Sequence, residues 1–259
     1  MGYVSLGRNT DMKNVFIKGK VDPAGIHASP LALEETNRLQ TIFDQRVEEL
    51  ATRDQKFWKI SYLNVKNGIN CHYQDVEVDN FLMSSDIFAL GETCLEQNDT
   101  VSFSGYQEYF ASHGRGKGVA VFSKMECASR PVVNSVSSNI FSAIHFRTVT
   151  FDAIFVYWSS GCHKQEETEI LSLLETWIVK DRPTTIMGDV NMNFSQDCKL
   201  NTFLERKGFK QLIKEATFEA GSLIDHIYAN EELRALDIST EQCSAYYSDH
   251  DIITILIPK

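Results

Sequence analysis

The sequence predicts a mixed α/β fold in which two runs of β-strands pack as a sandwich with helices outside. Residues 57–65 alternate between apolar and polar side chains, as a half-buried strand does. The apolar residues within 165–179 recur with the spacing of an amphipathic helix. The strands expected after residue 56 form two runs, and each run meets helices.

The composition is that of an ordinary globular protein. The chain has 259 residues, of which 43% are hydrophobic and 23% charged, enough for one large domain with a small appendage. Its six cysteines include no Cys-x-x-Cys pair, so we expect no zinc site, no disulfide framework and an intracellular location. No apolar run suggests a signal peptide or a membrane span.

The formal net charge of −10 argues against a broad basic surface for non-specific nucleic-acid binding. It does not exclude a nuclease, because metal-binding acids add negative charge and a local basic strip can still hold phosphates.

Residues 1–55 are expected to form a separate segment, and residues 56–259 the main domain. A turn signal, Asp22-Pro23-Ala24-Gly25, precedes a long polar helix. This helix starts at Ser29 as N-cap with Pro30 in its first turn, and it runs to about Leu50.

The first half of the main domain alternates strands and helices. After the strand 57–65 we expect a helix over about 74–84, a strand over 86–91 and one or two strands within 101–112. The Gly-rich, basic residues 113–117 are typical of a hairpin tip. Arg115 and Lys117 in this tip either contact a phosphate backbone or are simply solvated.

The second half continues with more strands. They are expected at 118–123, about 130–136, 139–147 and 149–157, and are followed by the helix 165–179. An apolar run over 184–187 predicts a short buried strand, and a helix over 198–207 ends at Gly208, a C-cap. A connection over 210–217 leads to closing strands at 222–228 and 252–257.

Polar residues stand where several of these strands end. Gly188 permits a sharp turn after the strand 184–187, and Asp189 and Asn191, two residues apart, point the same way. A carboxylate that takes a proton from water, beside an amide that positions the water, suits a hydrolase. Gly-Asp-x-Asn also occurs in ordinary turns. Other strand ends carry Asn64, Glu92, Asp225 and the pair Asp249-His250. Together these groups suit a hard divalent metal and water activation at a phosphate.

In their order and spacing these motifs resemble those of the endonuclease/exonuclease/phosphatase family. They are Asn64, Gly91-Glu92-Thr93, Gly188-Asp189-Val190-Asn191, Ile224-Asp225-His226-Ile227 and Ser248-Asp249-His250. The resemblance runs from about residue 56 to the end, and residues 114–121 and 223–227 are most similar to the retrotransposon-type members. It implies a four-layer α/β/β/α sandwich of two mixed β-sheets flanked by helices, with all five motifs at one edge.

The resemblance also implies roles for these residues. Glu92 is the expected first ligand of Mg²⁺ or Mn²⁺, with Asn64 beside it and Asp249 on the metal side. Arg115 and Lys117 are the expected phosphate contacts. The family places a tyrosine near the scissile phosphate at the position of Tyr157, but Trp158-Ser159-Ser160-Gly161 departs from the Arg-Pro-Pro that often follows.

The remaining roles concern proton transfer. Asp189 is the expected base or water-orienting group, and Asn191 holds it or the phosphate. His250 contacts the phosphate or supports water activation, and Asp225 orients the imidazole and favours its charged form. His226 is expected to pack or to form hydrogen bonds beside Asp225.

The N-terminal segment resembles the carboxyl end of a Pif-type DNA helicase. The similar residues are Tyr3-Val4-Ser5-Leu6-Gly7-Arg8, Asp22-Pro23 and residues 29–35. Gly7 stands where that family has Ser, and the chain has no Gly-x-x-x-x-Gly-Lys-Ser/Thr phosphate loop, so we expect no nucleotide cofactor. A helicase end joined to such a nuclease resembles Helitron-like transposon proteins.

These observations predict a Mg²⁺-dependent DNA endonuclease of transposon origin, monomeric and nuclear, with DNA as its partner and no membrane association. Two alternatives remain. One is a phosphatase of the same fold that acts on a small phosphorylated substrate, because fold does not determine substrate. The other is a catalytically silent remnant that binds nucleic acid. The full set of acids and amides favours activity, whereas the truncated helicase end favours decay.

Overall fold

The computed structural model describes six stretches of the chain and two single residues: 56–96, 98–112, 117–125, 131–159, 166–193, 199–259, Arg38 and Thr41. The chain divides into two units, Met1–Thr52 and Arg53–Lys259, and the description below concerns the second. The helicase-like segment and the helix expected after Ser29 lie outside the described residues.

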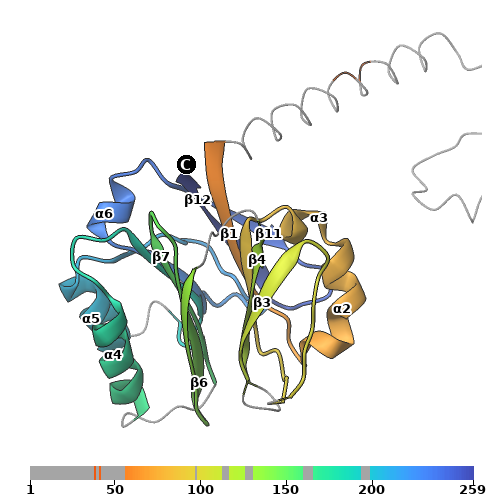
Figure 1. Cartoon of the computed structure of the whole chain (residues 1–259), viewed down its shortest axis with the longest axis horizontal. Coiled ribbons are helices and arrows are strands. Elements are labelled where there is room, and N and C mark those ends of the chain that lie inside the picture. The colour runs from red at the N-terminus through yellow and green to blue at the C-terminus, as the bar shows by residue number, and fades with distance from the viewer. Residues whose placement is uncertain are drawn as a thin grey trace, which may run out of the picture. The chain divides into compact units, whose positions relative to one another are not determined.

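Two six-stranded sheets form the centre of the described part (Figure 1). The first contains β1 (Phe57–Asn64), β2 (Ile87–Gly91), β3 (Tyr106–Ala111), β4 (Val119–Lys124), β11 (Ser239–Ser244) and β12 (Asp251–Pro258). The second contains β5 (Val132–Ser137), β6 (Phe141–Arg147), β7 (Asp152–Trp158), β8 (Thr184–Asp189), β9 (Lys210–Gln211) and β10 (Asp225–Ala229). Their strand orders are β11-β12-β1-β2-β4-β3 and β5-β6-β7-β8-β10-β9. Both sheets are mixed, because β1 is parallel to β2 and β7 is parallel to β8, whereas the other pairs are antiparallel.

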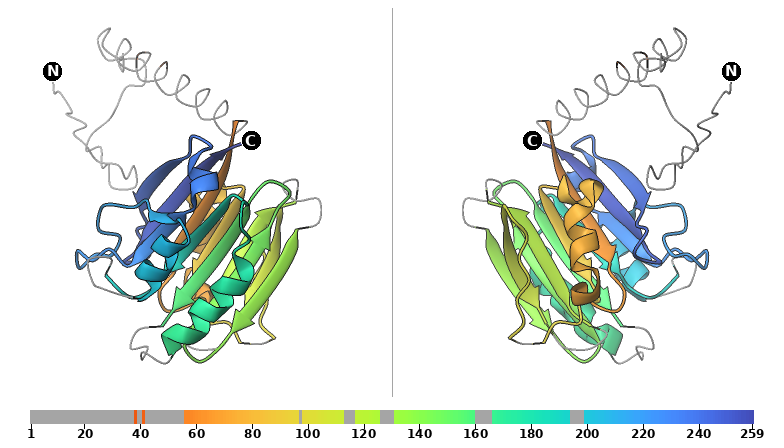
Figure 2. Two further views of the ribbon diagram at one scale, coloured as in Figure 1. Left: turned by 90° about the vertical axis from the view of Figure 1, so that its left-hand side faces the viewer. Right: turned by 90° about the vertical axis from the view of Figure 1, so that its right-hand side faces the viewer.

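Helices cover the outer face of each sheet, as Figures 1 and 2 show. α2 (Ile69–Val78) and α3 (Asn80–Met83) lie on the first sheet, and α4 (Glu166–Trp177) and α5 (Lys199–Arg206) lie on the second. This arrangement confirms the predicted four-layer sandwich. Among the described residues, no helix is both long enough and apolar enough to cross a membrane.

The two-residue period of the strands divides the apolar side chains between an inner and an outer layer. In β1, Ile60 and Tyr62 lie in the cluster between the sheets, whereas Leu63 belongs to the cluster under α2. In β2, Ala89 faces inward and Phe88 faces the helices. The central core is therefore built from the inner faces of both sheets.

The structure corrects several predicted boundaries. The helix expected over 74–84 is two helices, because the Asp79 carboxylate accepts hydrogen bonds from the N–H groups of Phe81 (3.0 Å) and Leu82 (3.1 Å) and so begins α3. Of the one or two strands expected within 101–112, the structure has one, β3, and the connection over 210–217 includes the short strand β9. β11 and the short helix α6 (Glu231–Arg234) were not predicted. The sequence of β11, Ser-Thr-Glu-Gln-Cys-Ser, is that of a polar edge strand without an apolar run.

Gly188 determines how closely β8 approaches β7. Its φ is 153°, and a Cβ added there would lie 1.8 Å from the carbonyl oxygen of Val156 and 2.7 Å from the carbonyl carbon. No side-chain rotation relieves a clash with backbone, so we expect Gly188→Ala to lower the free energy of unfolding by about 3 kcal/mol. Urea denaturation measures this loss.

Gly221→Ala is the matched control, because Gly221 has a φ of +85° and nothing lies within 4 Å of its added Cβ. It carries only the strain of a left-handed backbone, about 1 kcal/mol. Equal losses in the two variants would contradict the close-approach argument.

A buried carboxylate, Asp152, ties the ends of β6 and β7 to the turn before β8. It accepts hydrogen bonds from His145 Nε2 (3.0 Å), Arg147 Nη2 (2.9 Å) and Arg182 Nε (2.5 Å). Burial alone would raise the pKa of Asp152, but these hydrogen bonds outweigh burial and lower the pKa from 3.8 to about 2. The cluster therefore stabilises the fold at pH values above 3.8 and loses that contribution as the pH falls through about 2.

Asp152→Asn is expected to lower the free energy of unfolding at pH 7 by about 3 kcal/mol, because it leaves cationic partners without their carboxylate. The loss should be smaller at pH 3, where protonation has already removed part of the stabilisation in the wild type. Thermal unfolding at both pH values measures the difference, and losses of equal size would contradict the assignment.

Candidate active site

In the first sheet, the strand register brings several motif residues to one end of the sandwich. β1 and β2 are parallel and pair Asn64 with Gly91, so their carboxyl ends deliver Asn64 and Glu92 side by side. β12 runs antiparallel to β1. His250, directly before β12, therefore lies near the same end.

The second sheet delivers its motif residues to the same place. β7 and β8 are parallel and pair Tyr157 with Asp189, while the antiparallel β10 pairs Asp225 with Asp189. A hydrogen bond of 2.8 Å from Asn64 Nδ2 to Asp189 Oδ2 joins the ends of the two sheets. The five motifs, separated by up to 186 residues of sequence between Asn64 and His250 (250 − 64), thus form one cluster.

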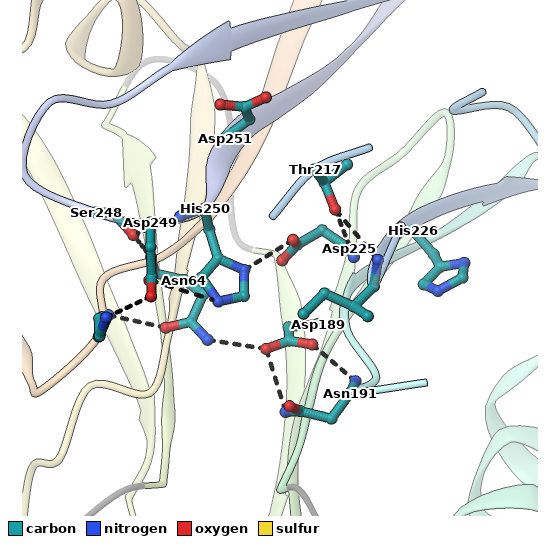
Figure 3. A network of polar contacts seen from close by, with 12 residues as sticks. Asn64, Asp189, Asn191, Thr217, Asp225, His226, Ser248, Asp249, His250 and Asp251 are labelled. Atoms are coloured by element: carbon teal, nitrogen blue, oxygen red, sulfur yellow. Dashed lines mark hydrogen bonds and ion pairs between the residues drawn. The ribbon is translucent and has the colours of Figure 1, made fainter. Parts of the chain in front are cut away.

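Asp189 lies at the centre of the cluster (Figure 3). Its buried carboxylate accepts hydrogen bonds from Asn64 Nδ2 (2.8 Å), from the main-chain N–H of Asn191 (2.7 Å) and from Asn191 Nδ2 (3.2 Å). Asn191 Nδ2 also donates to the carbonyl oxygen of Trp158 (2.6 Å). Asn191 has a φ of 52°, the left-handed conformation that folds its amide back onto the carboxylate. The orientation of Asp189 is therefore held from both sheets.

His250 and Asp225 form a second unit beside Asp189 (Figure 3). His250 Nδ1 lies 2.8 Å from Asp225 Oδ2, and a carboxylate partner means that Nδ1 carries the proton. Ser248 Oγ accepts from the His250 N–H (3.1 Å) and donates to the carbonyl oxygen of Asn64 (2.7 Å). Thr217 Oγ1 accepts from the N–H of Asp225 (3.0 Å). The imidazole is thus fixed with Nε2 directed into the site, 3.9 Å from Asp249 Oδ1.

Glu92 is held more loosely than Asp189. Its Oε1 accepts from the N–H of Asn67 (3.2 Å), and its Oε2 accepts from Asn64 Nδ2 (3.4 Å) and from the Tyr157 hydroxyl (3.3 Å). Glu92 is only partly buried and has a φ of 52°, which turns its side chain toward the cluster. Long hydrogen bonds and partial exposure leave its carboxylate oxygens available to a further ligand.

Lys66 also belongs to the cluster, although none of the sequence motifs includes it. Its Nζ forms an ion pair with Asp249 Oδ2, with side-chain exposures of 49% for Lys66 and 12% for Asp249. The available signal was its position two residues after Asn64, in the polar turn Lys66-Asn67-Gly68.

Residues 62–250 match the sequence profile of the Endonuclease/Exonuclease/phosphatase family, and this span contains the whole cluster. The chain belongs to this family. A search of curated protein sequences returns no match.

Solved structures share the family fold. The endonuclease domain of TRAS1, a telomere-specific non-LTR retrotransposon, is 16% identical with a TM-score of 0.59, over 78% of this chain and 98% of that chain. The 3′ phosphatase NExo from Neisseria is 17% identical with a TM-score of 0.63, over 77% and 99%. The AP endonuclease LMAP from Leishmania major is 10% identical with a TM-score of 0.62, over 79% and 89%. At these identities the likeness shows the fold.

The pKa values of Asp189 and His250 are both raised, for different reasons. Burial raises the pKa of the Asp189 carboxyl, and the negative charge of Asp225 raises it further, to about 8. Burial lowers the pKa of His250, but the hydrogen bond to Asp225 and the charges of Asp225 and Asp189 outweigh burial and raise it to about 9. The cluster therefore combines Asp189, whose carboxylate is more basic than usual, with His250, whose ring is held in its charged form.

Three further residues were singled out in the sequence: Arg115, Lys117 and His226. Arg115 is outside the described residues. The carbonyl oxygen of Lys117 accepts a hydrogen bond from the N–H of Cys94 (2.8 Å), so its main chain supports the Glu92 loop. His226 points away from the cluster, as Figure 3 shows, and its Nε2 lies 3.1 Å from the carbonyl oxygen of Met192. Burial lowers the pKa of His226 to about 4, so this ring stays neutral, as expected for a packing residue.

The donor set of the cluster fits a hard divalent cation. Asp189, Asp225 and His250 place ligand atoms within 4.8 Å of one another. However, His250 Nδ1 is bound to Asp225, and both oxygens of Asp189 accept N–H groups. Glu92 has the more available oxygens. The buried Asp249 Oδ1 and Asp225 Oδ1 have no hydrogen-bond partner among the described residues. Asn64 turns its NH₂ group to Glu92 and Asp189, so it positions these two carboxylates.

Proposed function

We propose that residues 56–259 form a divalent-metal-dependent phosphodiester hydrolase that cuts DNA internally. The observation that carries this proposal is the pairing of a triply hydrogen-bonded Asp189 with a charged His250–Asp225 unit in one buried cluster. Phosphodiester hydrolysis needs an activated water and positive charge at the phosphoryl oxygens. Asp189 is suited to activate the water, and the His250–Asp225 unit is suited to supply the positive charge.

Asp189 is the group that orients the attacking water and accepts its proton. The raised pKa makes its carboxylate a stronger base than an ordinary aspartate. The side-chain amides of Asn64 and Asn191 both donate to its Oδ2, and the main-chain N–H of Asn191 donates to its Oδ1. With both oxygens bound, the carboxylate resists rotation away from the water.

His250 donates from Nε2 to a phosphoryl oxygen, because Asp225 holds Nδ1 and keeps the ring charged. Tyr157 orients Glu92 through its hydroxyl, which stays protonated because burial, and next the charge of Glu92, raise its pKa. A Mg²⁺ or Mn²⁺ ion held by Glu92, with Asp249 on the same side, would supply Lewis-acid stabilisation of the phosphoryl charge.

DNA as substrate is supported by the chain's N-terminal segment. Residues 1–55, outside the described part, resemble a helicase end, and we infer a Helitron-like transposon origin for the fused chain. This origin implies a nuclear location. We propose that the nuclease part, residues 56–259, acts as a monomer.

Nicking of supercoiled plasmid tests the proposal. Wild-type protein with Mg²⁺ or Mn²⁺ should convert supercoiled to open-circular DNA, and EDTA should abolish the reaction. If well-folded wild type leaves the plasmid intact in both metals, the endonuclease proposal is wrong.

A phosphatase is the second candidate, because the 3′ phosphatase NExo shares the fold. Release of inorganic phosphate from a small phosphomonoester or a 3′-phosphorylated oligonucleotide, without nicking of intact plasmid, would favour it. Binding of DNA with neither reaction would indicate a silent remnant.

A further inference from the structure

The turn after β1 is strained at the edge of the cluster. Lys66 and Asn67 both have positive φ, 42° and 61°. Non-glycine residues in this conformation cost about 1 kcal/mol each, and such strain concentrates at functional sites. The turn places the N–H of Lys66 on Asn64 Oδ1 (2.9 Å) and the N–H of Asn67 on Glu92 Oε1 (3.2 Å). It therefore builds the site while it directs the Lys66 side chain to Asp249.

The Lys66 ammonium is bound on one side and accessible on the other. Its ion pair with Asp249 fixes one of its three N–H donors. The side chain is nevertheless 49% exposed, while that of Asp249 is only 12% exposed. The charge thus sits at the mouth of the cluster.

Four carboxylates, those of Glu92, Asp189, Asp225 and Asp249, crowd this end of the sandwich, in a chain of net charge −10. An anionic substrate must approach against them. Among the described lysines and arginines, Lys66 is the one whose ion pair reaches a carboxylate of this group. We propose that the Lys66 ammonium binds a backbone phosphate of the DNA, and that Asp249 holds it in position to do so. This inference rests on the proposed function.

Salt dependence of DNA binding in EDTA tests the contact without metal and without turnover. A protein cation that neutralises one phosphate of duplex DNA contributes about 0.9 to the slope of log K against log salt concentration. Lys66→Gln should therefore reduce the slope by about 0.9 and weaken binding about eightfold at 0.1 M salt. Lys66→Arg keeps the positive charge, so it should restore most of the slope and most of the affinity.

Lys210→Gln is the matched control, because Lys210 is exposed on β9 and pairs with Ala229, at the end of β10 away from Asp225. It removes the same charge and should leave the slope of log K against log salt concentration and the affinity for DNA unchanged.

In Mg²⁺, Lys66→Gln should raise KM more than it lowers kcat, whereas a merely structural role would lower the folded fraction without changing KM.

The possible outcomes separate this inference from the nuclease proposal. Wild-type binding with the expected change in Lys66→Gln, but no nicking, would keep the phosphate contact and overturn the nuclease. Nicking by the wild type with an unchanged slope in Lys66→Gln would overturn the phosphate contact alone. Absence of wild-type DNA binding in EDTA, or an equal change in Lys210→Gln, would also overturn it.

Discussion

Asp189→Asn is expected to lower kcat for DNA nicking by about 10²- to 10⁴-fold while the protein stays folded. The amide has the shape of the carboxylate but cannot accept a proton from water. The hydrogen bonds from Asn64 and Asn191 that hold Asp189 can persist in part through the remaining carbonyl oxygen. Initial rates of plasmid nicking at saturating DNA measure the loss.

The same variant is expected to gain stability without metal. A carboxyl whose pKa is raised on folding, from 3.8 to about 8 for Asp189, destabilises the fold increasingly as the pH rises between these values. Asp189→Asn removes this cost, so its Tm in EDTA should exceed that of the wild type at pH 8, by about 2–4 °C for each kcal/mol gained. The advantage should shrink toward pH 4.

Asp237→Asn is the control for both effects. Asp237 is exposed in the turn before β11, and its positive φ of 54° suits asparagine equally well. Its kcat and Tm should match the wild type. Full activity in Asp189→Asn would remove the general-base role, and a lower Tm in EDTA at pH 8 would contradict the burial argument.

His250→Gln is expected to lower kcat by about 10²- to 10⁴-fold, because glutamine can offer a hydrogen bond but no positive charge or transferable proton. The cationic form depends on Asp225, 2.8 Å from Nδ1. A histidine with a raised pKa contributes stability that is complete below 6.5 and is lost as the pH rises through about 9. The active form should decline over the same upper range.

Asp225→Asn tests this dependence directly. It removes the hydrogen bond and the charge that outweigh burial, so the pKa of His250 should fall. The alkaline limb of kcat/KM against pH should therefore move to lower pH. His72→Gln, on α2 outside the cluster, should leave rate and profile unchanged. An alkaline limb that stays in place in Asp225→Asn would show that His250 is not the titrating acid.

Much of this site could be predicted because its residues sit at the ends of strongly patterned strands. Asn64 ends an alternating strand, and Asp189 ends an apolar run after Gly188. Strand direction then carries these residues to one edge, since parallel neighbours end together. Lys66 could not be found in this way. It directly follows the strand 57–65, but a lysine in a polar turn is usually solvated, and its partner Asp249 lies 183 residues away, so that only folding brings the two charges together.

Strand β11 and the break between α2 and α3 could not be predicted for a related reason. β11 carries no apolar run, because it is an edge strand whose side chains are mostly partly exposed, and it forms by pairing with β12. The break between α2 and α3 depends on whether the Asp79 side chain caps a helix, a local hydrogen bond that helical periodicity does not report.

The sequence by itself determined the class of fold, the strand ends that bear the site and the family, because hydrophobic periodicity and short motifs are local properties of the chain. Only the tertiary structure decided that Asn64 donates to Asp189 across the two sheets, and that Lys66 stands at the mouth of the site on Asp249. These features depend on distances between residues remote in sequence. The pKa values of Asp189 and His250 depend further on burial, which exists only once both sheets have packed.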